Sequence, residues 1–134
     1  LVDRVHHRAH AFDQVAAVSA VIPFSLHPGH HTRSDLVEGM RTMMHAVGAE
    51  AAIRQTRAIM ARADHRAMLA QLHMPTLVVC GAQDKVTPPA LSDDLAALVP
   101  GAERLTLAQA GHQVPLEQPQ ALAAALMQLI TRAR

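Results

Sequence analysis

The sequence predicts an α/β protein in which a helical region over residues 1–74 precedes a partial parallel sheet over residues 75–134. Two observations support this fold class. Before Met74, apolar residues recur at helical spacing, whereas a continuous, β-branched run follows Pro75. A helical stretch then separates this run from a second short strand. The second half is therefore expected to form one βαβ unit followed by a C-terminal helix.

The first half is expected to be helices joined by short loops. Residues 1–10 have the pattern of the end of a polar helix, and residues 11–26 that of an amphipathic helix. A loop with Pro and Gly follows over residues 27–33. The next helix should stop near Gly48, a residue suited to a helix C-terminus, and a further helix is expected over residues 49–63.

The second half contains two strand patterns. Residues 76–80 read Thr-Leu-Val-Val-Cys, as in a strand buried on both faces. A helix over residues 88–99, begun by two prolines, leads to a second strand over residues 104–107. Such a unit places its strands parallel with a right-handed crossover. Pro119 opens the last helix, whose apolar residues are expected to face the sheet: Leu122, Leu126, Leu129 and Ile130.

Composition limits the classes of function. The chain has 134 residues, enough for one domain, with two Phe, no Tyr and no Trp. A net charge of +1 and the lack of stacking aromatics give no case for a nucleic-acid or membrane-surface partner. No apolar run reaches the roughly eighteen residues of a membrane span, and no signal peptide is expected. The single cysteine, Cys80, excludes an internal disulfide and suits a reducing, cytoplasmic location.

Two polar side chains follow the two predicted strands. Asp84 comes after the first strand, and His112 comes after the second. Because parallel strands bring their carboxyl ends to one edge of a sheet, these side chains can meet there. A carboxylate that orients an imidazole is the acid–base pair of a catalytic triad, and histidine is the side chain that titrates near neutrality. The alternative is that Asp84 only forms a turn and His112 is an ordinary loop histidine.

The order of these motifs resembles the C-terminal part of the α/β-hydrolase family. The matching patterns are Pro75-Thr76-Leu77-Val78-Val79, then Gly81-x-x-Asp84-x-x-Thr87-Pro88, then Ala110-Gly111-His112, and finally Glu117-x-Pro119. The resemblance implies that residues 1–74 are a helical cap, or lid, and that residues 75–134 are the C-terminal part of the hydrolase core. It also implies that Asp84 is the triad acid and His112 the base.

The nucleophile that such a pair serves is missing from this sequence. No Gly-x-Ser-x-Gly elbow occurs in the 134 residues. The resemblance implies hydrolysis of a small, largely apolar ester through an acyl-enzyme, with the small-molecule substrate bound in the complete enzyme. Thioester, epoxide, haloalkane and C–C bond hydrolysis are alternatives within the family. A different class is a non-catalytic truncated protein or one half of a split enzyme, partnered by the missing N-terminal half or by self-association.

The substrate pocket is expected to include Met40, Met44, Val86 and Val114, although a methionine stripe at helical spacing also fits a core. No cofactor or metal is expected, because the ten histidines match no metal-binding signature.

Three further residues are assigned structural roles. Cys80 lies within a strand and is expected to be a small buried residue, not a nucleophile. Lys85 is expected to face solvent. Glu117 is expected to favour the N-terminus of the last helix through the helix dipole.

Overall fold

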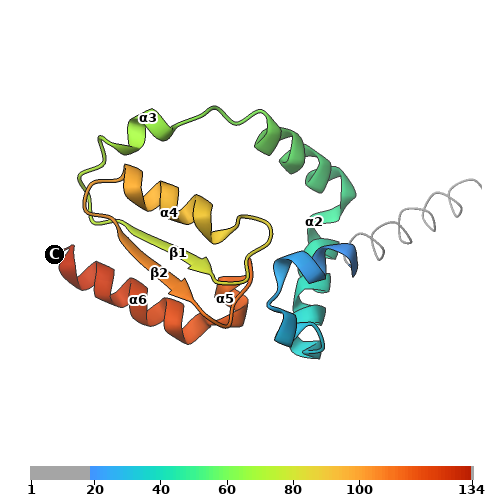
Figure 1. Cartoon of the computed structure of the whole chain (residues 1–134). Helices are drawn as coiled ribbons and strands as arrows, with labels where there is room; N and C mark the ends of the chain where they lie inside the picture. The colour runs from blue at the N-terminus through green and yellow to red at the C-terminus, as the bar shows by residue number, and fades with distance from the viewer. Residues whose placement is uncertain (1–18, 134) are drawn as a thin grey trace, which may run out of the picture.

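The computed structural model describes residues 19–133, whose centre is a two-stranded parallel sheet (Figure 1). β1 (Leu77–Gly81) pairs with β2 (Glu103–Leu107) along its whole length. Figure 1 shows α4 (Pro89–Leu98) on one face of this sheet and α6 (Pro119–Arg132) on the other. The predicted βαβ unit, its parallel pairing and the C-terminal helix are therefore confirmed.

The helical region begins with helical residues 19–25 and the short η1 (Pro28–His30). α2 (Ser34–Met60) is interrupted at Gly48, whose φ of 73° and ψ of 162° are not helical, so the two helices predicted to meet there do so. α3 (Arg66–Leu69) leads into β1. None of the helices in the described part is long and apolar enough to cross a bilayer. The predictions for residues 1–18 lie outside the described residues.

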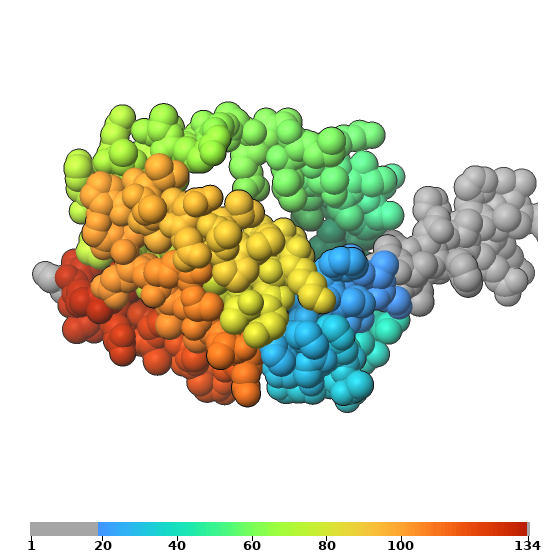
Figure 2. All heavy atoms as spheres, in the orientation of Figure 1, coloured from blue at the N-terminus to red at the C-terminus, as the bar shows by residue number. Residues whose placement is uncertain are grey.

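The helical region has a small apolar core of its own. It is formed by Ile22, Leu26, Leu36 and Met40, with Val37 and Met44 packed against it. Figure 2 shows this blue and cyan part seated against the yellow and orange segments beside it, while the green segment after it arches over α4. An open cavity of about 720 Å³ lies there, lined by Arg66 of α3 and by apolar residues of α4 such as Leu91 and Leu95.

The sheet is too narrow to cover the helices on it. In α6, Leu122 and Leu129 are half-buried, whereas Leu126 and Ile130 are 42% and 47% exposed, so the sheet covers only part of the apolar face predicted for this helix. Two strands offer less width than a helix face needs. β1 also pairs with one neighbour only among the described residues, which leaves its other edge without backbone partners.

Three stretches of backbone meet at the carboxyl end of the sheet with no side chain between them. A Cβ on Gly81 would lie 2.1 Å from the carbonyl oxygen of Gly111. A Cβ on Gly111 would lie 2.7 Å from the carbonyl carbon of Leu26 and 2.8 Å from the oxygen of Ser25. Real side chains do not approach this closely, so both positions require glycine. Through these two glycines, the end of β1, the loop after β2 and the segment before η1 pack backbone to backbone.

Gly111→Ala should lower the stability of the chain by roughly 1–3 kcal/mol, because the new methyl overlaps backbone that cannot move aside. Gly39→Ala is the matched control. Gly39 lies in α2 with nothing within 4 Å of a new Cβ, and alanine there should be neutral or stabilise by about 0.5–1 kcal/mol. Urea unfolding midpoints measured by circular dichroism test the pair. Equal midpoints for both variants would contradict the close packing.

The isolated chain should self-associate, because the free edge of β1 and the exposed apolar residues of α6 are unprotected. Size-exclusion chromatography with light scattering should show dimers or larger species, and thermal unfolding should be weakly cooperative. A monomer with a sharp, reversible and concentration-independent transition would show that these residues form a self-sufficient domain.

Candidate active site

Asp84 lies in the turn after β1 and its carboxylate is saturated with hydrogen bonds. Its side chain is 5% exposed. Oδ1 accepts from the backbone N–H groups of Val86 and Thr87, each at 2.8 Å. Oδ2 accepts from the Thr87 hydroxyl at 2.9 Å and from Nδ1 of His112 at 2.8 Å. Four donors thus hold the carboxylate in one orientation.

The pKa of Asp84 reflects two opposing effects. Burial disfavours the charge and raises the pKa. The hydrogen bonds from the Thr87 backbone, from His112, from the Thr87 hydroxyl and from the Val86 backbone together outweigh burial and hold the pKa below its ordinary value of 3.8. Asp84 is therefore an anion at neutral pH, as the partner of a histidine base must be.

His112 lies in the loop after β2, and its backbone N–H donates to the carbonyl of Ser25 at 2.8 Å. Its ring Nδ1 contacts Asp84 and lies 3.2 Å from the Thr87 hydroxyl oxygen. Since the Asp84 carboxylate can only accept, Nδ1 carries the hydrogen and Nε2 is left as the basic nitrogen. The contact between Asp84 and His112 that the sequence predicts is therefore present. The tautomer with its hydrogen on Nδ1 is the one that a general base acting through Nε2 requires.

An apolar cleft of about 530 Å³ opens beside His112, between the helical region and the acid turn. Three of the four residues predicted for the pocket line it, namely Met40, Met44 and Val86, and Phe24 adds an aromatic side chain. Met40 lines this cleft and also belongs to the apolar core of the helical region.

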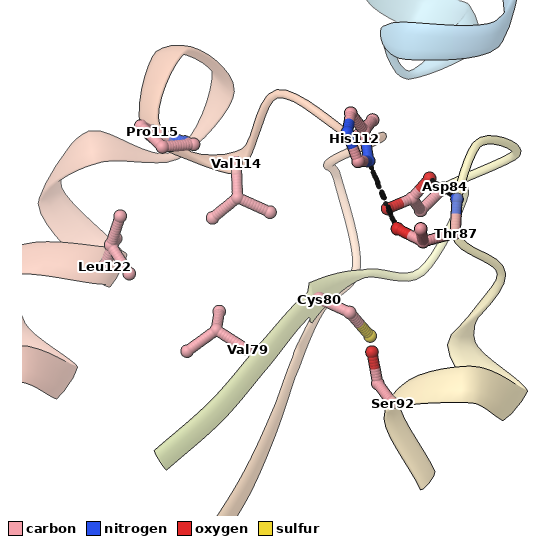
Figure 3. A pocket seen from close by; sticks show the side chains of 9 residues that line it. All are labelled: Val79, Cys80, Asp84, Thr87, Ser92, His112, Val114, Pro115 and Leu122. Atoms are coloured by element: carbon pink, nitrogen blue, oxygen red, sulfur yellow. Dashed lines mark hydrogen bonds and ion pairs between the residues drawn. The ribbon is translucent and has the colours of Figure 1, made fainter. Parts of the chain in front are cut away.

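Val114, the fourth predicted pocket residue, lies elsewhere. It lines a second cavity, of about 250 Å³, which Asp84, Thr87 and His112 also line (Figure 3). Figure 3 shows Val114 and Leu122 on one side of β1, and Cys80 with Ser92 on the other. Side chains from both sides of β1 therefore line this cavity. Val114 is separated from Met40 because the chain turns into α5 (Val114–Glu117) directly after the histidine loop.

Sequence reasoning missed the role of Glu117. Its side chain is fully buried, at 0% exposure, and its carboxylate binds groups from the histidine loop and from the helical region. The expectation that Glu117 acts through the dipole of the last helix was wrong. Its carboxylate instead binds His27 and His30, which lie 90 and 87 positions earlier in the chain. The Glu117-x-Pro119 pattern marks where this glutamate occurs in the sequence. No local pattern indicates that its carboxylate binds Gly111, His27 and His30.

The remaining assignments concern residues without a part in the acid–base contact. Cys80 is buried and Lys85 is exposed, as predicted. Within residues 19–133, no three histidine, cysteine or acidic side chains gather as a metal site would require.

Asp84→Asn should remove a pH-dependent part of the stability. Because the pKa of Asp84 is lowered by folding, its ionisation stabilises the folded state above the ordinary value of 3.8, and this contribution is lost as the pH falls through the folded-state pKa. Wild type and variant should therefore differ most near neutrality and converge at low pH. Urea midpoints from about pH 3 to about pH 7 measure the difference. A difference independent of pH would contradict the assignment.

Comparison with known proteins gives the family. The sequence profile described as the alpha/beta hydrolase fold matches residues 16–119. The chain is 38% identical over 84 residues to a pimeloyl-acyl-carrier-protein methyl ester esterase of Xanthomonas oryzae pv. oryzae, a match covering 61% of this chain and 33% of that protein. A protein of the same name from Stenotrophomonas maltophilia is 31% identical over 75% of this chain and 39% of its own length. The chain thus spans between 33% and 39% of the length of these two relatives.

Solved structures agree. An esterase from Thermogutta terrifontis superposes with a TM-score of 0.84 at 24% identity, over 97% of this chain and 48% of that one. The enol-lactonase from Burkholderia xenovorans LB400 gives a TM-score of 0.79 at 25% identity, over 88% and 45%. With a profile match over most of its length and a fold shared with these enzymes, the chain belongs to the α/β-hydrolase family.

Proposed function

We propose that this chain carries the acid and the base of an esterase that hydrolyses a small, largely apolar carboxylic ester through an acyl-enzyme. The observation that carries the proposal is the 2.8 Å contact between Asp84 Oδ2 and His112 Nδ1. Asp84 is the triad acid and His112 the general base. A cytoplasmic location belongs to the same proposal and is supported by the single, unpaired Cys80.

The cleft and the relatives support an ester substrate with an apolar body. The cleft beside His112 is lined by methionine, valine and phenylalanine side chains, which favour an apolar acyl or alkyl group. The relatives named above as methyl ester esterases act on an ester. Thioester, epoxide, haloalkane and C–C bond hydrolysis remain alternatives, distinguished by the identity of the nucleophile.

In the proposed reaction, Nε2 of His112 takes the proton of a serine hydroxyl as its oxygen attacks the ester carbonyl carbon. The imidazolium, stabilised by the Asp84 anion, then protonates the leaving alcohol as the C–O bond breaks. Water, deprotonated by the same Nε2, attacks the acyl carbon; the bond from this carbon to the serine oxygen breaks, the imidazolium returns the proton to the serine, and the carboxylic acid leaves. His112 is thus used twice, while Asp84 keeps its charge throughout.

The serine has to come from outside the 134 residues, since no Gly-x-Ser-x-Gly occurs in them. This favours a second candidate, in which the chain is one half of a split enzyme or a truncated, non-catalytic protein. The free edge of β1 lies beside Asp84 and His112 and supports a partner that adds a strand there. That partner is proposed to be the N-terminal half of the fold or, for a non-catalytic protein, a second copy of this chain.

The chain alone should give no turnover of p-nitrophenyl butyrate, because it lacks the nucleophile and the oxyanion-hole donors that accompany it. A polypeptide encoded upstream that supplies Gly-x-Ser-x-Gly should restore activity when mixed or fused. His112→Ala should then reduce kcat by roughly 10⁴-fold or more, and Asp84→Asn by about 10⁴-fold.

Esterase activity of the pure chain that His112→Ala abolishes would overturn the external nucleophile and the inactivity of the chain alone. A reconstituted enzyme that keeps its activity after His112→Ala would overturn the assignment of His112 as the base. Glu103→Gln, a change at an exposed carboxylate paired with Arg132, is the control for nonspecific effects of substitution.

A further inference from the structure

Glu117 is a buried charge with no part in the proposed reaction. It ends the short α5, and its side chain is 0% exposed. Oε2 accepts from the backbone N–H of Gly111 at 2.6 Å. Oε1 accepts from the backbone N–H of His27 at 2.6 Å and lies 3.0 Å from Nδ1 of His30. A buried carboxylate is tolerated only when donors surround it, and here the donors come from two separate segments.

The two segments are those that fix the backbone of His112. Gly111 is the residue immediately before His112, and Ser25, two residues before His27, accepts the N–H groups of His112 and Gln113 at 2.8 and 3.1 Å. The histidine loop is therefore bound on one side by the Ser25 carbonyl and on the other by the Glu117 carboxylate. Both anchors join the loop to the same stretch of the helical region.

This double anchor matters because the His112 ring has little other support. Its side chain is 36% exposed, and the contacts that orient it are those of Nδ1 with Asp84 and Thr87. A small rotation of the loop would carry Nδ1 out of hydrogen-bond reach. The ring could then take either tautomer, and only one of them is a competent base at Nε2.

We propose that Glu117 is a positioning residue for the general base. Its carboxylate clamps the histidine loop to residues 25–30, so that the Nδ1 hydrogen of His112 stays directed at Asp84. His30 supports the clamp through the contact of its Nδ1 with Oε1 of Glu117. That the clamp serves a general base rests on the proposed function of His112. The effect of the clamp on the His112 ring can be measured without any catalysis.

The test measures the tautomer of His112 by ¹⁵N NMR of sedimented, histidine-labelled full-length chain, a sample form that tolerates self-association. His112→Gln assigns the signal. The wild type should show a single Nδ1–H form. Glu117→Gln keeps the size of the side chain but replaces an acceptor with an amide, and it should convert His112 to a mixture of both tautomers. Hydrogen exchange at Gly111 and His27 should accelerate roughly tenfold or more.

Glu103→Gln is the matched control, since it makes the same chemical change at a glutamate whose partner is the exposed Arg132, and it should leave His112 unchanged. His30→Ala, which removes one donor and keeps the carboxylate, should give a smaller fraction of the second tautomer. It decides the question if Glu117→Gln fails to fold.

A single His112 tautomer in a folded Glu117→Gln variant would overturn the proposal, even if exchange were faster, because the carboxylate would then serve stability alone. If the Glu117→Gln variant does not fold, a single tautomer in His30→Ala would do the same. An unaltered tautomer in these variants leaves the esterase proposal standing. A reconstituted enzyme insensitive to His112→Ala would remove the esterase proposal while leaving the clamp intact.

Discussion

The arrangement of the site depends on the contact between three stretches of backbone at the carboxyl end of the sheet. Gly81 and Gly111 let the end of β1, the histidine loop and residues 25–27 touch without side chains between them. Such contact leaves backbone amides buried, and buried amides need acceptors. The Ser25 carbonyl and the Glu117 carboxylate supply them. The backbone around Gly111 and residues 25–27 is therefore both closely packed and fully supplied with hydrogen-bond acceptors for these amides.

Two buried carboxylates with different partners stand on either side of His112. Asp84 is bound by its own turn and by the imidazole of His112, and these donors stabilise its negative charge. Glu117 is bound mainly by backbone N–H groups, one from the histidine loop and one from the helical region. Each carboxylate is shielded from water. In this buried environment its hydrogen bonds are stronger than they would be at the surface.

The helical region and the sheet differ in how well they cover apolar side chains within the described residues. The region before β1 has an apolar core and one wall of a cleft, whereas the sheet has two strands and leaves apolar residues of α6 exposed. The chain spans 33% and 39% of the length of two esterases that it matches. Asp84 and His112 follow the carboxyl ends of β1 and β2, so one cavity touches both β1 and this pair of side chains.

The sequence by itself determined the features that depend on local pattern. The β-branched run before Cys80, the prolines at residue 88 and at residue 119, and the glycine at residue 48 predicted the elements, and strand order predicted that Asp84 and His112 would meet. Only the tertiary structure decided the partners of Glu117, the separation of Val114 from Met40, and the exposure of Leu126. These depend on contacts between residues far apart in the chain and on how many strands are present to cover a helix. Periodicity and local motifs carry no information about either.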